Sequence, residues 1–179
     1  MTGMIDAFVD HGLETQFEDL SADAVRATKT YLLDTLGVGI AGAAVPLTKA
    51  VRASADQWAG DGAAHVWGPG SARTTPANAA FINGFQIHCQ EYDCVHEPAV
   101  VHPLATILSA LMAECDARGN VSGRDLAVAM AVAVDLDFEM QTVLLDQNGG
   151  RVAGAAVVAD QLGTVLKTGF TTITQHNTQ

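Results

Sequence analysis

The feature that most constrains this chain is a series of helix-start signals, each followed by apolar residues at helical spacing. Ser21 is a plausible N-cap, and Thr75-Pro76 and His102-Pro103 each place a proline at a first helical position. Ser122 and Asp125 form a capping box with Asp in place of Glu. The chain is therefore expected to form an all-α, helical bundle-like domain over residues 1–165, followed by a polar tail over residues 166–179.

Two local predictions accompany this fold class. The glycine-rich stretch between the second and third predicted helices reads as a loop with a short extended piece at His65–Trp67. In the helix that opens at Pro76, the apolar spacing predicts an inward-facing stripe that runs Ala77, Phe81, Phe85, His88 and Tyr92.

Composition limits the partners. Only 16% of the residues are charged, against about 25% in an average soluble domain. This shortfall predicts apolar surface that a partner chain covers, and hence a homodimer or a larger assembly. The net charge of −11 repels phosphate backbones, so we expect no binding to nucleic acid.

The cysteines and the apolar stretches indicate the compartment. The chain has three cysteines, an odd count with no Cys-x-x-Cys pair, which indicates a reducing environment. Its first residues lack the basic region of a signal peptide. The apolar stretches Thr35–Thr48 and Pro98–Ala113 are too short to span a bilayer. We expect a cytoplasmic protein without a membrane partner.

A glycine motif offers a competing function. Gly37, Gly39 and Gly42 match the G-x-G-x-x-G fingerprint of dinucleotide-binding proteins. That fingerprint requires a strand before it and a helix that opens at it. Here the preceding residues have helical spacing, and Pro46 follows soon after. Close helix packing is the better interpretation, and no cofactor is expected.

The densest group of reactive side chains lies between two predicted helices. Asp93 is expected where a helix ends, where the negative end of the helix dipole disfavours a charged carboxylate. His102 is expected at the start of the next helix, where the positive end of the dipole disfavours the imidazolium. Such a pair suits proton transfer near neutral pH. The alternative is an ordinary polar loop between two helices.

A metal site is a rival use of the same residues. His88, Glu91 and Asp93 form H-x-x-E-x-D, and His96 and His102 lie nearby. This spacing matches no zinc-protease signature, and a lone helical histidine is more often a packing residue than a ligand. We therefore predict no metal.

These residues also carry a resemblance to a known family. Asn83-Gly84, His88, Glu91-Tyr92-Asp93 and His102-Pro103 resemble the MmgE/PrpD family's run of Asn-Gly, His, Leu-Asp-Phe/Tyr-Asp-Asp and His-Pro-Ser. The resemblance is collinear over roughly residues 5–145; it also includes Leu33–Gly37, Val66–Gly68 and Asp137–Gln141.

The resemblance implies a mostly helical domain joined, in the family, to a smaller α+β lid. It implies a lyase, a dehydratase or decarboxylase that acts on small tricarboxylates such as 2-methylcitrate or cis-aconitate. Asp93 and His102 would be catalytic, and His88, Glu91 and Tyr92 would contact the substrate. A non-catalytic, dimer-forming remnant and an epimerase or isomerase relative remain alternatives.

The chain departs from the family pattern at several points. Cys94 replaces the second Asp of the Asp-Asp pair, and Leu104 replaces the Ser of His-Pro-Ser. A segment of the family is missing, with a junction expected near residues 147–150, and no residues resemble the lid. The active site is therefore expected to be incomplete, unless a separate chain supplies the lid.

Overall fold

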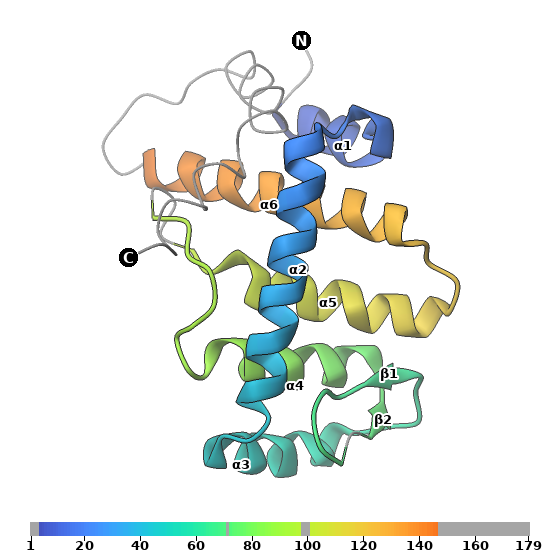
Figure 1. Cartoon of the computed structure of the whole chain (residues 1–179), viewed down its shortest axis with the longest axis vertical. Helices are drawn as coiled ribbons and strands as arrows, with labels where there is room; N and C mark the ends of the chain where they lie inside the picture. The colour runs from blue at the N-terminus through green and yellow to red at the C-terminus, as the bar shows by residue number, and fades with distance from the viewer. Residues whose placement is uncertain (1–3, 71, 98–100, 147–179) are drawn as a thin grey trace. The chain divides into compact units, whose positions relative to one another are not determined.

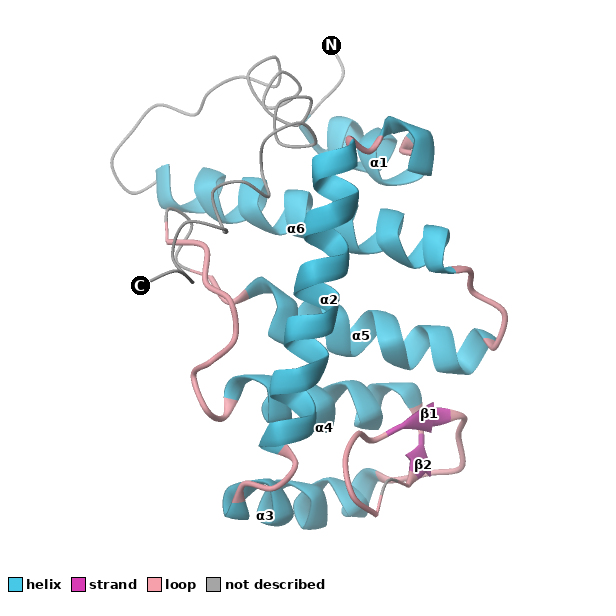
Figure 2. Ribbon diagram, in the orientation of Figure 1, coloured by secondary structure: helices cyan, strands magenta, loops and turns pink. Residues whose placement is uncertain are grey.

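A computed structural model describes residues 4–70, 72–97 and 101–146 (Figure 1). The predicted tail at 166–179, the domain boundary at 165 and the junction near 147–150 lie outside these residues. The described residues form six α-helices, and Figure 2 shows how little strand accompanies them. The all-α prediction is confirmed. The helices are α1 (Met4–Glu14), α2 (Ala22–Gly42), α3 (Pro46–Ala55), α4 (Pro76–His88), α5 (Pro103–Arg118) and α6 (Gly123–Asp146).

The predicted helix-start signals act as expected. The Thr75 side chain accepts a hydrogen bond from the Asn78 backbone N–H, and Pro76 is the first residue of α4. Ser122 and Asp125 form the reciprocal bonds of a capping box before α6. Gly119 ends α5 with a φ of 75°, a conformation that glycine adopts at no steric cost.

The described residues fall into two compact units. Among the described residues, unit 1 consists of those within 1–29, 95–101 and 127–179, and unit 2 consists of those within 30–94 and 102–126. In unit 1 the His96 ring stacks on Phe138 with a centroid distance of 3.8 Å. Unit 2 contains α3, α4 and α5, the later turns of α2, and every predicted site residue.

Two glycines of α2 pack closely against their neighbours in unit 2. A Cβ on Gly42 would lie 1.9 Å from the backbone oxygen of Gln86 in α4, and one on Gly39 would lie 2.8 Å from the Trp67 ring. Real atoms do not approach so closely, so only glycine fits at these positions. The helix-packing interpretation of the G-x-G-x-x-G motif is therefore confirmed for Gly39 and Gly42, whereas a Cβ on Gly37 would meet nothing within 4 Å.

The predicted inward stripe of α4 is wrong in part. Ala77 is exposed, Phe81 is 51% exposed, and Tyr92 is 74% exposed and lies beyond the end of the helix. The buried side chains are Asn78, Ala79, Ile82, Asn83, Gln86 and Ile87. Asn83 and Gln86 occupy buried positions because their amides bond to backbone groups that would otherwise be buried without partners.

Asn83 and Gln86 connect α4 to its neighbours. Asn83 accepts a hydrogen bond from the Trp67 N–H and donates one to the His65 carbonyl, both 2.9 Å long. These bonds hold both ends of the predicted extended piece, His65–Trp67. Of that piece, His65 belongs to β1 (Ala64–His65), which pairs with β2 (Arg73–Thr74) in antiparallel register. A small apolar core lies beneath, made of Ala55, Ala64, Val66, Ala79, Ile82 and Ala113.

Two 3-10 turns, η1 (Phe17–Asp19) and η2 (Asp56–Trp58), complete the described elements. No single described helix has both the length and the apolar content needed to cross a membrane. Taken together, α2 and the segment Pro46–Trp58 are long and apolar enough, but the two are bent by 89° relative to each other.

The glycine contact gives a matched pair of substitutions. Gly42→Ala is expected to lower the free energy of unfolding by about 3 kcal/mol or more, because the new methyl meets backbone rather than a movable side chain. Gly37→Ala in the same helix meets nothing within 4 Å and is expected to stabilise by about 0.5–1 kcal/mol. Urea denaturation of both variants measures the difference. Equal effects would contradict the close approach of α2 and α4.

Candidate active site

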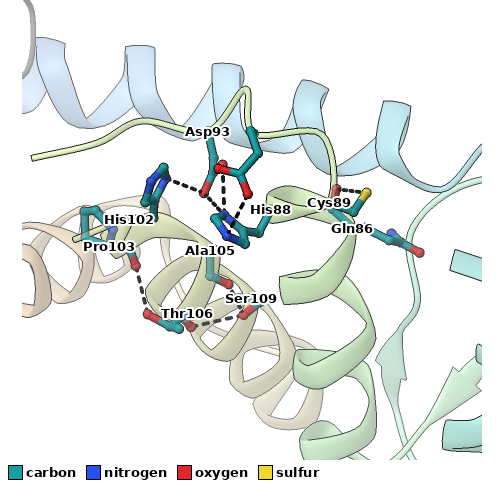
Figure 3. A network of polar contacts seen from close by, with 10 residues as sticks. Gln86, His88, Cys89, Asp93, His102, Pro103, Ala105, Thr106 and Ser109 are labelled. Carbon is teal, nitrogen blue, oxygen red and sulfur yellow. Dashed lines mark hydrogen bonds and ion pairs between the residues drawn. The ribbon is translucent and has the colours of Figure 1, made fainter. Parts of the chain in front are cut away.

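The chain between α4 and α5 brings three predicted site residues together. His88 is the last residue of α4, His102 is the N-cap of α5, and Asp93 lies in the connection between them. His88 Nδ1 is 3.2 Å from Asp93 Oδ1 and 3.1 Å from Oδ2. His102 Nδ1 is 3.2 Å from the same Oδ2 (Figure 3). One carboxylate therefore contacts two imidazoles.

Asp93 is the buried member of this cluster. Its side chain is 0% exposed, while those of His88 and His102 are 45% and 33% exposed. A buried carboxylate needs partners of opposite charge or hydrogen-bond donors. His88 supplies hydrogen bonds, whereas His102 Nδ1 lies close to Oδ2 without the alignment of a hydrogen bond. A small rotation of the His102 ring would complete the second bond.

The predicted position of Asp93 at a helix end is wrong. The C-cap of α4 is Cys89, so Asp93 lies beyond the helix. Glu91 takes a positive φ of 55°, and this left-handed residue turns the chain after α4. The two imidazoles, rather than the helix dipole, form the electrostatic environment of Asp93. The predicted position of His102, at the start of α5, is confirmed.

The structure separates the two remaining predicted residues. Glu91 Oε1 lies 3.3 Å from His88 Nε2, although the Glu91 side chain is 71% exposed. Such an exposed pair contributes little stability, but it places Glu91 at the edge of the cluster. Tyr92 is 74% exposed and makes no hydrogen bond or ion pair with His88, Asp93 or His102. A substrate contact by Tyr92 stays a prediction.

The cluster has a composition that also suits a metal ion. One possible ligand atom from each of His88, Asp93 and His102 lies within 4.8 Å of the others, and two histidines with one carboxylate form a known set of ligands. Hydrogen bonding and ion pairing account for the same spacing without an ion. The prediction that no metal binds stays untested.

A pocket that the sequence did not predict opens beside His88 and His102. Its cavity volume is about 600 Å³, and it lies between α4 and α5. Its lining residues are Ala80, Phe81, Gly84, Phe85, His88, Cys89, His102, Ala105, Thr106 and Ser109. Phe81, Phe85 and His88 are residues of the stripe that was predicted to face the core. The periodicity was therefore detected correctly, but it marks the lining of a pocket.

Comparison with known proteins places the chain. Residues 6–169 match the model of the MmgE/PrpD N-terminal domain. The chain belongs to the MmgE/PrpD family. It is 31% identical over 129 residues to cis-aconitate decarboxylase of Mus musculus, covering 70% of this chain and 26% of the relative. The human cis-aconitate decarboxylase is 30% identical over the same shares of the two chains.

A cis-aconitate decarboxylase-like protein of Aspergillus oryzae is 31% identical over 149 residues, which cover 83% of this chain and 30% of the relative. The chain therefore spans less than a third of the length of these MmgE/PrpD relatives.

Cys94 has a physical role at the position where the MmgE/PrpD pattern has its second Asp. The thiol is buried, and the backbone N–H of Leu104 in the first turn of α5 bonds to it. Burial, with a smaller contribution from the nearby Asp93, raises the pKa of the Cys94 thiol to about 12. Cys94 thus interacts with the start of α5 as a neutral thiol.

This environment predicts the reactivity of Cys94. A pKa near 12 instead of 9 lowers the fraction of reactive thiolate at neutral pH about a thousandfold. We expect iodoacetamide to modify the half-buried Cys89 in the native chain, and to reach Cys94 only after denaturant is added. Mass spectrometry of digested peptides follows both sites at once. Equal rates in the native chain would show that Cys94 is not buried against α5.

Proposed function

We propose that this chain carries the proton-transfer part of a lyase site that removes water or carbon dioxide from a small tricarboxylate. The observation that supports it best is the buried Asp93 carboxylate between His88 and His102, beside a pocket. The mammalian relatives are named cis-aconitate decarboxylases, and such an activity agrees with this chemistry.

Both reactions require a proton to move at a carbon next to a carboxylate. Dehydration removes a proton from that carbon and releases the hydroxyl of the neighbouring carbon as water, which leaves a carbon–carbon double bond. Decarboxylation breaks a carbon–carbon bond and leaves its electron pair on carbon, which then takes up a proton. A neutral imidazole accepts the first proton, and an imidazolium donates the second.

The exposures suggest which residue does this. His102 lines the pocket, whereas the Asp93 side chain is 0% exposed and is out of reach of a substrate. We therefore assign proton transfer to His102. Asp93 faces its Nδ1 nitrogen, stabilises the imidazolium and leaves Nε2 for the substrate, as a carboxylate does for histidine in hydrolases. His88 holds the Asp93 carboxylate from the other side.

The charge of the pocket limits what the described residues achieve alone. No lysine or arginine is among the residues that line it, although a tricarboxylate brings up to three negative charges. The helix N-terminus at His102 contributes at most about 2 kcal/mol. Transition-state stabilisation depends on fixed positive groups, so we propose that a further segment or a separate chain supplies them.

This assignment predicts partial chemistry. With citrate, 2-methylcitrate or cis-aconitate in deuterated water, we expect the chain to exchange substrate protons for deuterium slowly, with little net formation of product. His102→Ala should lower the exchange about a hundredfold, and Asp93→Asn should also lower it. Proton NMR of the substrate measures exchange, and ultraviolet absorbance detects unsaturated product. His65→Ala is the control, because His65 pairs with Asp116 away from the pocket.

The other outcomes separate the alternatives. Neither exchange nor substrate binding would contradict the proposal and favour a non-catalytic remnant. Exchange with inversion at a stereocentre, and no unsaturated product, would favour an epimerase. Fast turnover that either site substitution abolishes would show that the pocket needs no additional positive groups.

We also propose that the partner of this chain is a second copy. Leu33 and Ile40 in α2 are 76% and 52% exposed, and residues seven apart lie on one helix face. Sedimentation at micromolar concentration is expected to give a dimer, and Leu33→Glu is expected to dissociate it. Leu13→Glu is the matched control, because Leu13 is also 76% exposed but lies in α1. A monomeric wild-type chain with a cooperative thermal transition would contradict this prediction.

A further inference from the structure

The pocket between α4 and α5 has two chemically different ends. We infer that it binds the hydrocarbon substituent of a carboxylate substrate, with the carboxylate end at His88 and His102. The inference rests on the proposed function, and it extends that function by naming the substrate class: a tricarboxylate that carries an alkyl substituent of several carbons.

The geometry of the helix pair sets the two ends. His88 at the end of α4 lies beside His102 at the start of α5, with ring centroids 4.8 Å apart. A Cβ on Gly84 would lie 2.9 Å from the Ala105 oxygen and 3.2 Å from Ser109 Oγ, so the two helices run antiparallel in close contact. The pocket extends from the imidazoles along both helices toward Phe81.

Away from the imidazoles, the pocket offers almost no polar group to a ligand. Thr106 donates its hydroxyl to the Pro103 carbonyl at 3.0 Å. Ser109 donates to the Ala105 and Thr106 carbonyls, at 2.7 and 3.0 Å (Figure 3). With these donors used within α5, the remaining lining consists of Phe81 and Phe85 with small residues between them. Carboxylates placed there would lose hydration without compensation.

The size of the pocket points the same way. A volume of about 600 Å³ corresponds to about twenty water molecules at about 30 Å³ each. It lies within the range of pockets that bury a whole organic ligand, about 300–1,000 Å³. A methyl substituent would leave most of this space unfilled, whereas a chain of several methylenes would contact both phenylalanines.

Burial of a methylene contributes about 0.8 kcal/mol, which corresponds to about fourfold in affinity. The affinity of such ligands is therefore expected to increase about fourfold with each methylene until the chain fills the pocket. The imidazole end should favour a carboxylate over a cation of the same chain length, because His102 Nε2, the nitrogen that Asp93 leaves for the substrate, is the nearest possible donor.

The experiment titrates the full chain, with its alanine methyl groups labelled with ¹³C, with succinate and with butyl-, hexyl- and octylsuccinate. The methyl signals of Ala80 and Ala105 are expected to shift, with affinity rising about fourfold per methylene. The exposed Ala50 is an internal reference. Octyltrimethylammonium, the charge-reversed probe, is expected to bind at least tenfold more weakly than octylsuccinate.

Two variants on α5 test the location. Thr106→Phe fills the pocket from an exposed position and is expected to abolish the dependence on chain length. Ala117→Phe adds the same ring to the same helix at an exposed position outside the lining, and should bind like the wild-type chain. Similar melting temperatures would show that both variants fold.

Three results would overturn the inference. They are equal affinity for succinate and octylsuccinate, chain-length dependence that survives Thr106→Phe, and a dimer that Thr106→Phe dissociates in the absence of any ligand effect. The last would mean that a second copy occupies the pocket. Deuterium exchange, measured separately, tests the proposed function. Binding without exchange would leave the pocket assignment intact and contradict the proposed function. Exchange without chain-length dependence would reject the pocket assignment and leave the proposed function intact.

Discussion

The buried side chain of Gln86 is the interaction on which the rest of unit 2 depends. Its amide donates to the carbonyls of Gly39 and Trp67, and its oxygen accepts from the Arg52 guanidinium at 2.7 Å. One fully buried amide thus connects α2, the loop before β2 and α3 to α4. Since every one of these groups would be costly to bury alone, they fix the rotation of α4 about its own axis.

That rotation creates the candidate site. Because Asn83 and Gln86 point inward, the residues on the opposite face of α4 point outward. These residues are Phe81, Phe85 and His88. The apolar pocket and the outward position of the imidazole that holds Asp93 therefore both follow from the rotation of α4 about its axis. Stability is obtained on the polar face of α4, and the opposite face is left free for a ligand. The chemistry of the cluster thus depends on amides that never touch it.

The sequence predicted those parts of the fold that depend on local chemistry. Prolines at first helical positions, the Thr75 cap and the Ser122–Asp125 box determine helix starts within a few residues, so they could be read directly. The direction in which α4 faces depends on partners such as Gly39 and Trp67, distant in the sequence. Polarity alone therefore assigned the wrong face. Likewise, the proximity of His88, Asp93 and His102 could be predicted, but the burial of Asp93 between two imidazoles could not.

The glycine contact between α2 and α4 also limits how the length of the chain can vary. Each residue of an α-helix advances the chain by about 100° around the axis. A single insertion between Tyr31 and Gly39 would therefore rotate Tyr31, whose pKa is raised by burial and by the nearby Cys94, away from the site while Gly39 stayed in register. Natural variation in length should accordingly be absent between Tyr31 and Gly39, so that α2 keeps a constant number of residues between the site and the glycines.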